Sequence, residues 1–512
     1  MRRYLMNNIS DIEYSELMNQ SYIDYSMSVI TDRAVPDVRD GLKPVQRRVL
    51  YDMYKQHLHH NTPYKKCAKI VGDVLGRFHL HGEQSAYDAL VVMAQPWKRN
   101  ECFVDGHGNF GSVEGDVAAA MRYTEARLSE IAEECYLQDL DKPIVSMIPN
   151  FDNTETEPEV LPCLIPNILI SGAEGIAVGM TTKIPTHNLG EVIDAALQYL
   201  DNPNSRLSTL MRHLPGPDFP SGGIITTPKG ITELYETGKG KFKLRGQYHV
   251  ESVAGSTRKR IVITSIPYMM IGENIHKFLE DVAKLVELKE LTGITDISNQ
   301  SAKGDIKIVL DIRSTADPYE IMKVICEKTK FEDTFSANML VVHNTRPEVM
   351  NLKQLLDAFV SFQREMYAAK FQYLKEQAER KCGVLSGLIS AIHVMPSIID
   401  MLSGSKTVDV ARRCLMTGDT ADIEFTAAKF KKVASTFRFS ELQANTILNM
   451  KLSKLVQMEL SDLNKQQDEA LEQLAKYTDL VAYPELRDKE IRKTLLRIKR
   501  KYAKPRKTDI MG

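Results

Sequence analysis

Apolar side chains recur at helical spacing in two parts of this chain. In residues 44–55 they fall at i, i+4, i+5 and i+8, which predicts a helix with one buried stripe. From residue 351 they recur near heptad spacing, which predicts long helices that Gly383 and Pro396 interrupt. The apolar positions are Val45, Val49, Leu50 and Met53 in the first stretch, and Leu352, Leu355, Leu356, Phe359 and Phe362 in the second.

Further helices are predicted toward the end of the chain, from about residue 440 toward 477 and from about residue 485. Two long helices with a helical segment between them can form an antiparallel arm whose tip dimerises. A packed bundle that does not dimerise is the alternative. The segment 501–512 is basic and is predicted to be an unstructured tail.

Between residues 230 and 335 the pattern changes to strands combined with helices. The stretches KFKLRGQYHVE, RIVITSIP and DIKIVLDIR have the alternation and β-branched content of strands. Residues 273–290 and 316–329 have the apolar spacing of helices. This combination predicts an α+β domain.

A helix–turn–helix is predicted over residues 63–93. Pro63 opens the first helix, Gly76 closes it, and the second helix runs from about Glu83 to Met93. Such a unit commonly places its second helix on DNA, although helical hairpins are also frequent in proteins that do not bind DNA.

A glycine-rich stretch, VDGHGNFGSVEGDVAAAMRYTEARL, occupies residues 104–128. Its glycines permit positive φ angles, Asp116 is predicted to cap a helix, and the residues after it are predicted to form that helix. Arg122 and Tyr123 are adjacent in it. A cation beside a phenol stabilises phenoxide and can bind a phosphate, which makes Tyr123 a candidate nucleophile. An ordinary Arg–Tyr pair is the alternative.

Composition and charge narrow the class of protein. Of the 512 residues, 43% are hydrophobic and 26% charged, as in globular proteins, and no apolar run of about 18 residues or signal-like start predicts a membrane span or secretion. The seven scattered cysteines include no CxxC pair, which indicates reduced thiols and argues against a zinc ribbon. The net charge is −1, but residues 33–77 hold ten Lys and Arg against four Asp, a candidate phosphate-binding surface. Asp139 and Asp141 are predicted to be surface residues, and no metal site is predicted.

Several stretches resemble the A subunits of bacterial type IIA DNA topoisomerases, the family of gyrase and topoisomerase IV. They are SYIDYSMSVITDRAVPDVRDGLKPVQRR, GNFGS followed by GDVAAAMRYTE, and SGAEGIAVGM. The resemblance covers residues 20–500 and implies a multidomain α+β fold. Its expected parts are an N-terminal arm (1–30), a winged-helix breakage-reunion domain (31–160), an α+β tower (161–335), a long antiparallel coiled-coil arm with a helical dimerisation tip (336–500) and a basic tail (501–512).

The resemblance also implies roles for individual residues. Tyr123 is expected to attack a DNA phosphate and Arg122 to neutralise the charge that develops there. Ile176, in a glycine-rich turn, is expected to wedge between base steps and bend the duplex, whereas a core position is the alternative. The residues expected to bind DNA are Arg33, Lys43, Arg47, Arg48, His79, His81 and Ile176. From the residues alone, a metal site at His79 and His81 is the weaker alternative.

The expected function is that of the A subunit of an ATP-dependent type II topoisomerase, which cleaves double-stranded DNA through a 5′-phosphotyrosyl intermediate. Its expected partners are a second copy, bound through the coiled-coil tip and the winged-helix domain, and a B subunit in a cytoplasmic A2B2 complex. The B subunit is expected to bind both Mg²⁺ and ATP. Because no basic box or blade repeat of a DNA-wrapping domain is found, relaxation or decatenation is expected rather than supercoiling. A DNA-bending paralogue that does not cut is one alternative and a tyrosine recombinase another.

One departure from the family pattern concerns its drug-contact region. Gln84 replaces a serine, while Asp88 keeps the acidic position four residues later. Low quinolone sensitivity is therefore expected. The sequence does not separate gyrase from topoisomerase IV.

Overall fold

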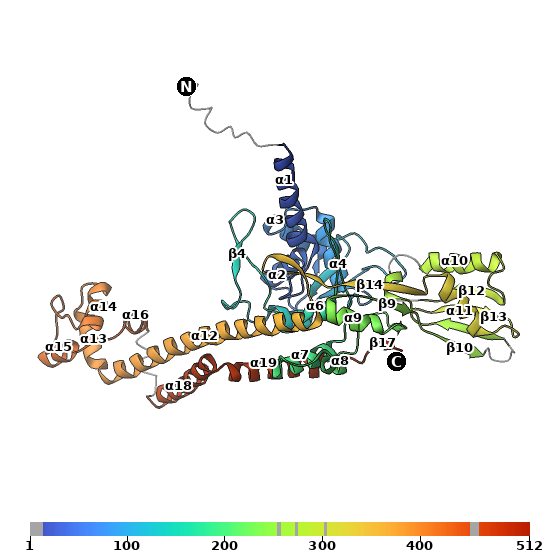
Figure 1. Cartoon of the computed structure of the whole chain (residues 1–512). Helices are drawn as coiled ribbons and strands as arrows, with labels where there is room; N and C mark the ends of the chain where they lie inside the picture. Colours follow the sequence, from blue (N-terminus) through green and yellow to red (C-terminus); the bar gives the residue numbers. More distant parts are fainter. Residues whose placement is uncertain (1–13, 253–257, 272–274, 302–304, 451–459, 512) are drawn as a thin grey trace, which may run out of the picture. The chain divides into compact units, whose positions relative to one another are not determined.

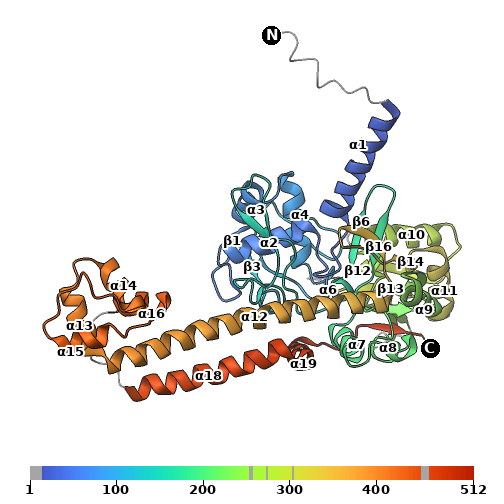
Figure 2. The ribbon, with the colours of Figure 1, turned by 60° about the vertical axis from the view of Figure 1, so that its left-hand side comes forward.

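The chain forms two compact units, residues 1–366 together with 490–512, and residues 367–489. The computed structural model describes residues 14–252, 258–271, 275–301, 305–450 and 460–511, and Figures 1 and 2 show its elements. Within these residues every strand lies in the first unit, and the second unit is helical. The predicted mixture of helices and strands, with long helices, is therefore confirmed.

Three helices and a small sheet follow the N-terminal helix of the first unit. Helices α2, α3 and α4 pack on one another, and β1, β3 and β2 pair antiparallel in that order. The predicted helix at 44–55 is confirmed with its apolar stripe buried. The predicted helical pair is confirmed too, but its first helix begins at Cys67 rather than Pro63, because the two preceding lysines pair with β3. The bounds are α1 (Tyr14–Val29), the π-helical η1 (Ile30–Ala34), α2 (Pro44–Lys55), β1 (Lys65–Lys66), α3 (Cys67–Arg77), α4 (Glu83–Ala94), β2 (Val104–His107) and β3 (Glu125–Leu128).

The helix predicted after Asp116 is wrong. Residues 117–124 are non-helical, and 125–128 form β3 at the centre of the small sheet. The backbone here bonds to distant segments instead of to itself: Ala119 N–H donates to Asn109 O, while Cys67 N–H donates to Thr124 O. These long-range bonds outweigh the helix propensity of three consecutive alanines.

Two larger sheets complete the first unit. One has the strand order β17-β8-β9-β14-β7-β6, and the other, β10-β11-β13-β12, is antiparallel. Helices α10 and α11 pack on the second sheet over a core of Ile, Leu and Phe side chains, so the α+β prediction for 230–335 is confirmed. The bounds are α5 (Glu130–Ala132), η2 (Glu133–Leu137), β4 (Met147–Pro149), β5 (Thr156–Pro158), α6 (Asn167–Ser171), β6 (Ala173–Ile176), β7 (Thr181–Ile184), α7 (Leu189–Asp201), α8 (Leu207–His213), β8 (Gly223–Ile225), α9 (Lys229–Thr237), β9 (Lys239–Arg245), β10 (Tyr248–Ser252), β11 (Lys259–Ile263), η3 (Tyr268–Met270), α10 (Ile275–Glu287), β12 (Ile294–Asn299), β13 (Ile308–Ile312), α11 (Pro318–Lys328), β14 (Glu332–Asn338), β15 (Leu340–His343) and β16 (Arg346–Val349).

The prediction that residues 501–512 form an unstructured tail is wrong for the part that the structure describes. Helix α19 (Pro484–Tyr502) continues into an extended segment, and β17 (Thr508–Ile510) pairs parallel with β8. Thr508 is fully buried. The basic side chains are paired: Arg506 donates to the Glu191 carboxylate at 2.8 and 2.5 Å and to the carbonyl oxygens of residues 216, 217 and 508. The positive charge of this segment therefore has partners within the fold.

Arg506→Ala should lower the free energy of unfolding of the first unit by about 2–3 kcal/mol, because it leaves Glu191 and three carbonyl oxygens without their donor. Urea unfolding followed by the fluorescence of Trp97, the chain's single tryptophan, measures this unit. The control Arg500→Ala removes an exposed side chain from the preceding helix, α19, and should change stability by less than about 0.5 kcal/mol. Equal losses in the two variants would contradict a role for the Arg506 contacts.

The second unit contains two long helices joined by shorter ones. Helix α12 (Leu352–His393) enters it from the first unit, and α18 (Leu460–Ala482) lies beside α12, with Phe371 stacked on Tyr477. The predicted break near Pro396 is confirmed, because α12 ends at His393 and α13 begins at Met395. The predicted break at Gly383 is wrong: the residue lies inside α12, and its carbonyl accepts a 2.7 Å bond from Gln443. The shorter helices are α13 (Met395–Gly404), α14 (Val408–Thr417), α15 (Ala428–Ala434) and α16 (Glu441–Leu448).

Two sequence predictions extend beyond the described residues. Residues 1–13 of the predicted arm and 451–459 of the helix predicted from 440 lie outside them. In the part of the chain that is described, no single helix is long and apolar enough to cross a membrane. Helices α12 and α13, taken together, have the length and composition of a membrane span, but the pair is bent by 86°.

Candidate nucleic-acid interface

Tyr123 lies on the surface of the small helix–sheet region, in the turn before β3. Its side chain is 64% exposed. The Arg122 guanidinium lies over its ring, with Cζ 4.7 Å from the ring centre. The phenol oxygen is thus open to an approaching molecule, with a cation fixed beside the ring.

The backbone around Tyr123 is held by the helices below it. Tyr123 N–H donates to Ala120 O, and Ala68 N–H, at the start of α3, donates to Met121 O. On α4, the Tyr87 hydroxyl donates to Ala119 O at 2.6 Å and lies 2.8 Å from the hydroxyl of the buried Thr124. Burial raises the pKa of Tyr87, so this hydroxyl keeps its proton and remains a donor. The backbone is therefore held on several sides, while the Tyr123 side chain is exposed.

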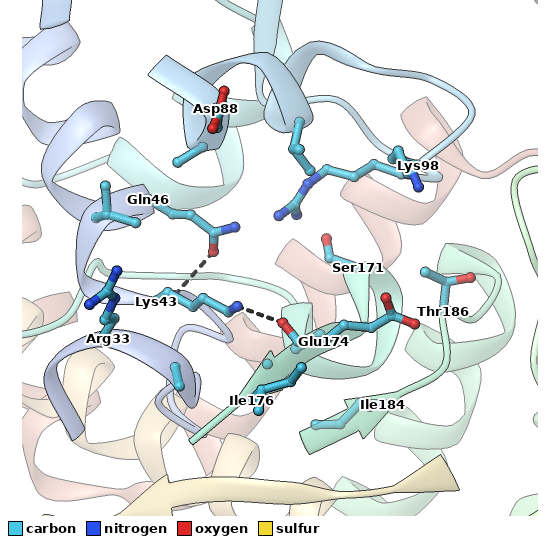
Figure 3. Close-up of a pocket in the computed structure, with 18 of the residues that line it drawn as sticks. Arg33, Lys43, Gln46, Asp88, Lys98, Ser171, Glu174, Ile176, Ile184 and Thr186 are labelled. Atoms are coloured by element: carbon cyan, nitrogen blue, oxygen red, sulfur yellow. Dashed lines mark hydrogen bonds between the residues drawn. The ribbon is translucent and has the colours of Figure 1, made fainter. Parts of the chain in front are cut away.

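A hollow of about 650 Å³ opens between η1, α2, α4 and the β6–β7 hairpin (Figure 3). Lys43 reaches across it, and its Nζ donates to Glu174 O at 2.5 Å. Burial, and then the charge of Arg99, lower the pKa of Lys43. Of the predicted site residues, four line this hollow: Arg33, Lys43, Asp88 and Ile176.

Ile176 ends β6 at the rim of the hollow with 85% of its surface exposed. Next to it, Gly175 packs so tightly on η1 that an added Cβ would lie 2.1 Å from Ala34 O. The glycine therefore lets the hairpin dock, and the turn that follows, closed by Ala177 N–H donating to Met180 O, projects the isoleucine outward. An exposure of this size excludes the alternative that Ile176 belongs to the core.

The Arg47 side chain is buried in the protein, whereas a side chain that binds DNA would be exposed. It is 8% exposed, and its Nε and Nη2 donate to the fully buried Asp40 at 2.7 and 2.9 Å. Asp40 also accepts from the backbone N–H groups of Leu42 and Leu161. Arg47 thus neutralises a buried carboxylate that ties α2 to the segment around 161, and its geometry does not support the predicted contact with DNA.

Arg48, His79 and His81 form a second group. Arg48 donates two 2.8 Å bonds to Glu157 and lies 3.2 Å from His79 Nδ1, and the two imidazole centres are 4.7 Å apart. Burial, and then the Arg48 charge, lower the pKa of His79 to about 4. At neutral pH, His79 is therefore uncharged, and only 4% of its surface is exposed.

The metal alternative for these histidines finds no support. Among the described residues, no group of three or more His, Cys, Asp and Glu side chains could hold a metal ion. Asp139, of the Asp139–Asp141 pair, is bonded by Lys142 instead.

The sequence of the chain matches known proteins over nearly its whole length. A family model of the DNA gyrase/topoisomerase IV A subunit matches residues 33–496. The chain belongs to the DNA gyrase/topoisomerase IV A-subunit family. It is 42% identical over 499 residues to the DNA gyrase A subunit of Clostridium acetobutylicum, a match that covers 98% of this chain and 57% of that protein. It is 40% identical over 504 residues to that of Streptococcus pneumoniae, covering 98% and 58%.

The resemblance seen in the sequence motifs is therefore confirmed at the level of this family. The chain spans less than three fifths of the length of the curated relatives it matches. The DNA gyrase A subunit of Streptococcus pyogenes matches with the same identity and coverage as the S. pneumoniae protein.

Gln84, at the family's drug-contact position, interacts with Asp88. Both lie on α4, and the Gln84 amide donates to Asp88 Oδ1 at 2.7 Å. They also line a second hollow, of about 680 Å³, together with Trp97 and Val117. The drug-contact role of these two residues stays a prediction.

The structure brings only part of the predicted site together. Tyr123 and Arg122 do not line the hollow that holds Lys43 and Ile176. Sequence reasoning also missed lining residues, namely Lys98, Arg99 and Glu174. The adjacent pair Lys98–Arg99 would have been found by extending the search for basic residues past residue 77.

Proposed function

We propose that this chain is the DNA-cleaving A subunit of a type IIA topoisomerase that acts on double-stranded DNA. The observation that carries the proposal is the exposed Tyr123 under the Arg122 guanidinium, on a backbone held by α3 and α4, in a chain of this family. The Tyr123 oxygen attacks a backbone phosphorus, the bond to the 3′ oxygen breaks, and the phenol proton leaves as the 3′ hydroxyl gains one. One phosphodiester replaces another, so the reverse step reseals the strand.

The other parts of the fold fit the same function. The α2–α4 helices with the β1-β3-β2 sheet support a winged-helix domain, and the β10-β11-β13-β12 sheet with α10 and α11 supports a tower. The paired helices α12 and α18 support a coiled-coil arm that dimerises at its helical tip. We further propose that Arg33, Lys43, Arg48, His79 and His81 bind the duplex.

Mg²⁺ and ATP are proposed to bind to a partner B subunit in an A2B2 assembly in the cytoplasm. The described residues of this chain include no cluster fit to hold a metal ion. The chain's own residues supply the nucleophile, the neighbouring cation and the surface that orients DNA.

Covalent trapping tests the proposal. The full chain, its cognate B subunit and Mg²⁺ are incubated with 3′-labelled duplex, the mixture is denatured, and the protein–DNA adduct is mapped by mass spectrometry. A 5′-phosphoryl group on Tyr123 is expected. A 3′-phosphoryl adduct would indicate a recombinase, and DNA bending without any adduct would indicate an idle paralogue.

Ile176→Ala should reduce DNA bending and cleavage more than DNA affinity, because a wedge acts through deformation of the duplex. Energy transfer between dyes on the two DNA ends measures the bend, and fluorescence anisotropy measures affinity. Val408→Ala is the matched control, since Val408 is also an exposed apolar residue (62%) but lies on α14 in the second unit. A bend equal to wild type in the Ile176 variant would reject the wedge.

A further inference from the structure

Val113 ties the segment that ends in Tyr123 to the four-stranded sheet β10-β11-β13-β12. Of residues 111–123, all of which the structure describes, Val113 alone is buried, with 3% of its surface exposed. The apolar cluster that holds it is the core of this sheet, and among the described residues its other buried members all lie within 261–331. The segment is therefore anchored in a different part of the fold from α3 and α4, which hold the backbone next to Tyr123.

A hydrogen bond lies beside this apolar anchor. Asn299 is the last residue of β12, and its side-chain amide donates to Glu114 Oε1 at 2.5 Å. The sheet therefore holds two consecutive residues of the segment, Val113 by burial and Glu114 by a hydrogen bond.

A closed turn connects the anchor with the rest of the segment. Ser112 Oγ donates to Asp116 Oδ2 at 2.8 Å, and Ser112 N–H donates to Asp116 O at 3.2 Å. Just before the turn, Gly111 has a φ of +93°, and a Cβ at this position would lie 2.6 Å from Asp116 O. The turn therefore needs glycine at this position, and it contains Val113 within a ring of its own hydrogen bonds.

Beyond the turn, the segment has few side-chain contacts of its own. Residues 116–120 are described and include no buried side chain. Backbone groups hold them instead: Ala119 N–H donates to Asn109 O, and the Ala119 carbonyl accepts from the Tyr87 hydroxyl. A segment this exposed depends on its anchored ends for a fixed position.

We propose that Val113 is a positioning residue for the attack by Tyr123, acting through the closed turn 112–116. Because Val113 is buried, it contacts neither DNA nor the reacting atoms, and its effect is to fix where residues 116–123 lie. Displacing a reacting group by ~1 Å can cost about 10²-fold in rate. The role in the reaction rests on the proposed function, whereas the anchoring of the segment does not.

The first experiment measures the anchoring without DNA. Hydrogen–deuterium exchange of the full chain is followed by mass spectrometry of peptides that span residues 108–124. In Val113→Ala these peptides should exchange about ten-fold faster than in wild type, because loss of the buried methyl groups shifts the opening equilibrium of the segment that they hold. Exchange equal to wild type would overturn the proposal.

Val282→Ala is the matched control. Val282 is fully buried on α10 in the same apolar core, so the substitution removes the same methyl groups from the sheet without touching the segment. It should leave exchange in residues 108–124 at the wild-type rate. Faster exchange there in both variants would show a general loosening of the sheet and would overturn the specific role of Val113.

The second experiment measures cleavage with the cognate B subunit and Mg²⁺. Val113→Ala should slow single-turnover cleavage at saturating DNA about ten-fold, while its DNA affinity stays within about two-fold of wild type. A wild-type rate in Val113→Ala, or an equal loss in Val282→Ala, would overturn the proposal. If the wild-type chain forms no adduct at Tyr123, the proposed function fails and the role in the reaction fails with it, while the exchange experiment still decides whether Val113 anchors the segment.

Asn299→Ala covers the case in which Val113→Ala does not fold. It removes the bond to Glu114 from the side of the sheet and leaves every apolar side chain of the core in place. Exchange in residues 108–124 should rise and cleavage should slow, each by about three-fold, as expected for the loss of one hydrogen bond. No change in either quantity would overturn the link between the sheet and the Tyr123 segment.

Discussion

Tyr123→Phe should abolish DNA cleavage and leave DNA affinity within a few-fold of wild type. The substitution removes only the oxygen that attacks phosphorus, and phenylalanine has no atom that can form the phosphodiester. The fold should be unaffected, because the ring is 64% exposed and the turn beneath it is held through the backbone by α3. The positive side chains proposed to bind DNA remain in place.

The measurement is the yield of covalent adduct on a labelled duplex, with affinity followed in parallel by anisotropy. Tyr319→Phe is the matched control, since Tyr319 is similarly exposed (71%) but lies on α11. It should cleave like wild type. Adduct formed at wild-type yield by the Tyr123 variant would reject the assignment of the nucleophile.

Arg122→Lys should slow single-turnover cleavage by roughly 10²-fold or more. In the structure the guanidinium Cζ lies 4.7 Å from the centre of the Tyr123 ring, a position from which the edge of the planar group can pair with a phosphate oxygen. Lysine keeps the charge but has neither the plane nor the fork, so stabilisation of the developing charge in the transition state should be lost.

The same small sheet offers a matched control. Arg127 lies over the ring of Tyr64, with Cζ 4.2 Å from its centre, and bonds to Asp105. Arg127→Lys therefore changes an equivalent Arg–Tyr stack without touching Tyr123, and its cleavage rate should stay close to wild type. Similar rates in the two lysine variants would show that the position of Arg122 beside the nucleophile has no catalytic importance.

The sequence predicted best those elements whose signal is local. Residues 44–55 have amphipathic spacing that survives in the fold, because the same stripe that predicts the helix is the stripe that is buried. The helix predicted after Asp116 failed because backbone bonds to residues far away in sequence decide that segment. Spacing along the chain carries no information about such bonds.

The candidate site shows the same difference between features with a local sequence signal and features that depend on long-range contacts. The Arg122–Tyr123 pair and Ile176 were found through motifs, and the structure exposes Tyr123 and Ile176. The environment of Arg47 could not be predicted, because its partner Asp40 faces it only after α2 and the preceding turn have formed. Arg99 was missed for a related reason: the hollow that it lines is created by segments from several parts of the chain together.

Strand β17 links the folding of the first unit to the order of synthesis. It covers the edge of β8, so the six-stranded sheet is incomplete until residue 510 has left the ribosome. Residues 367–489 are made in the meantime, which takes about 6–25 s at ~5–20 residues per second. During that interval β8 presents an unpaired edge, which can form hydrogen bonds with strands other than β17. The nascent chain is therefore exposed to mispairing that the finished sheet avoids. The second unit, which is continuous in sequence, can finish folding before the first.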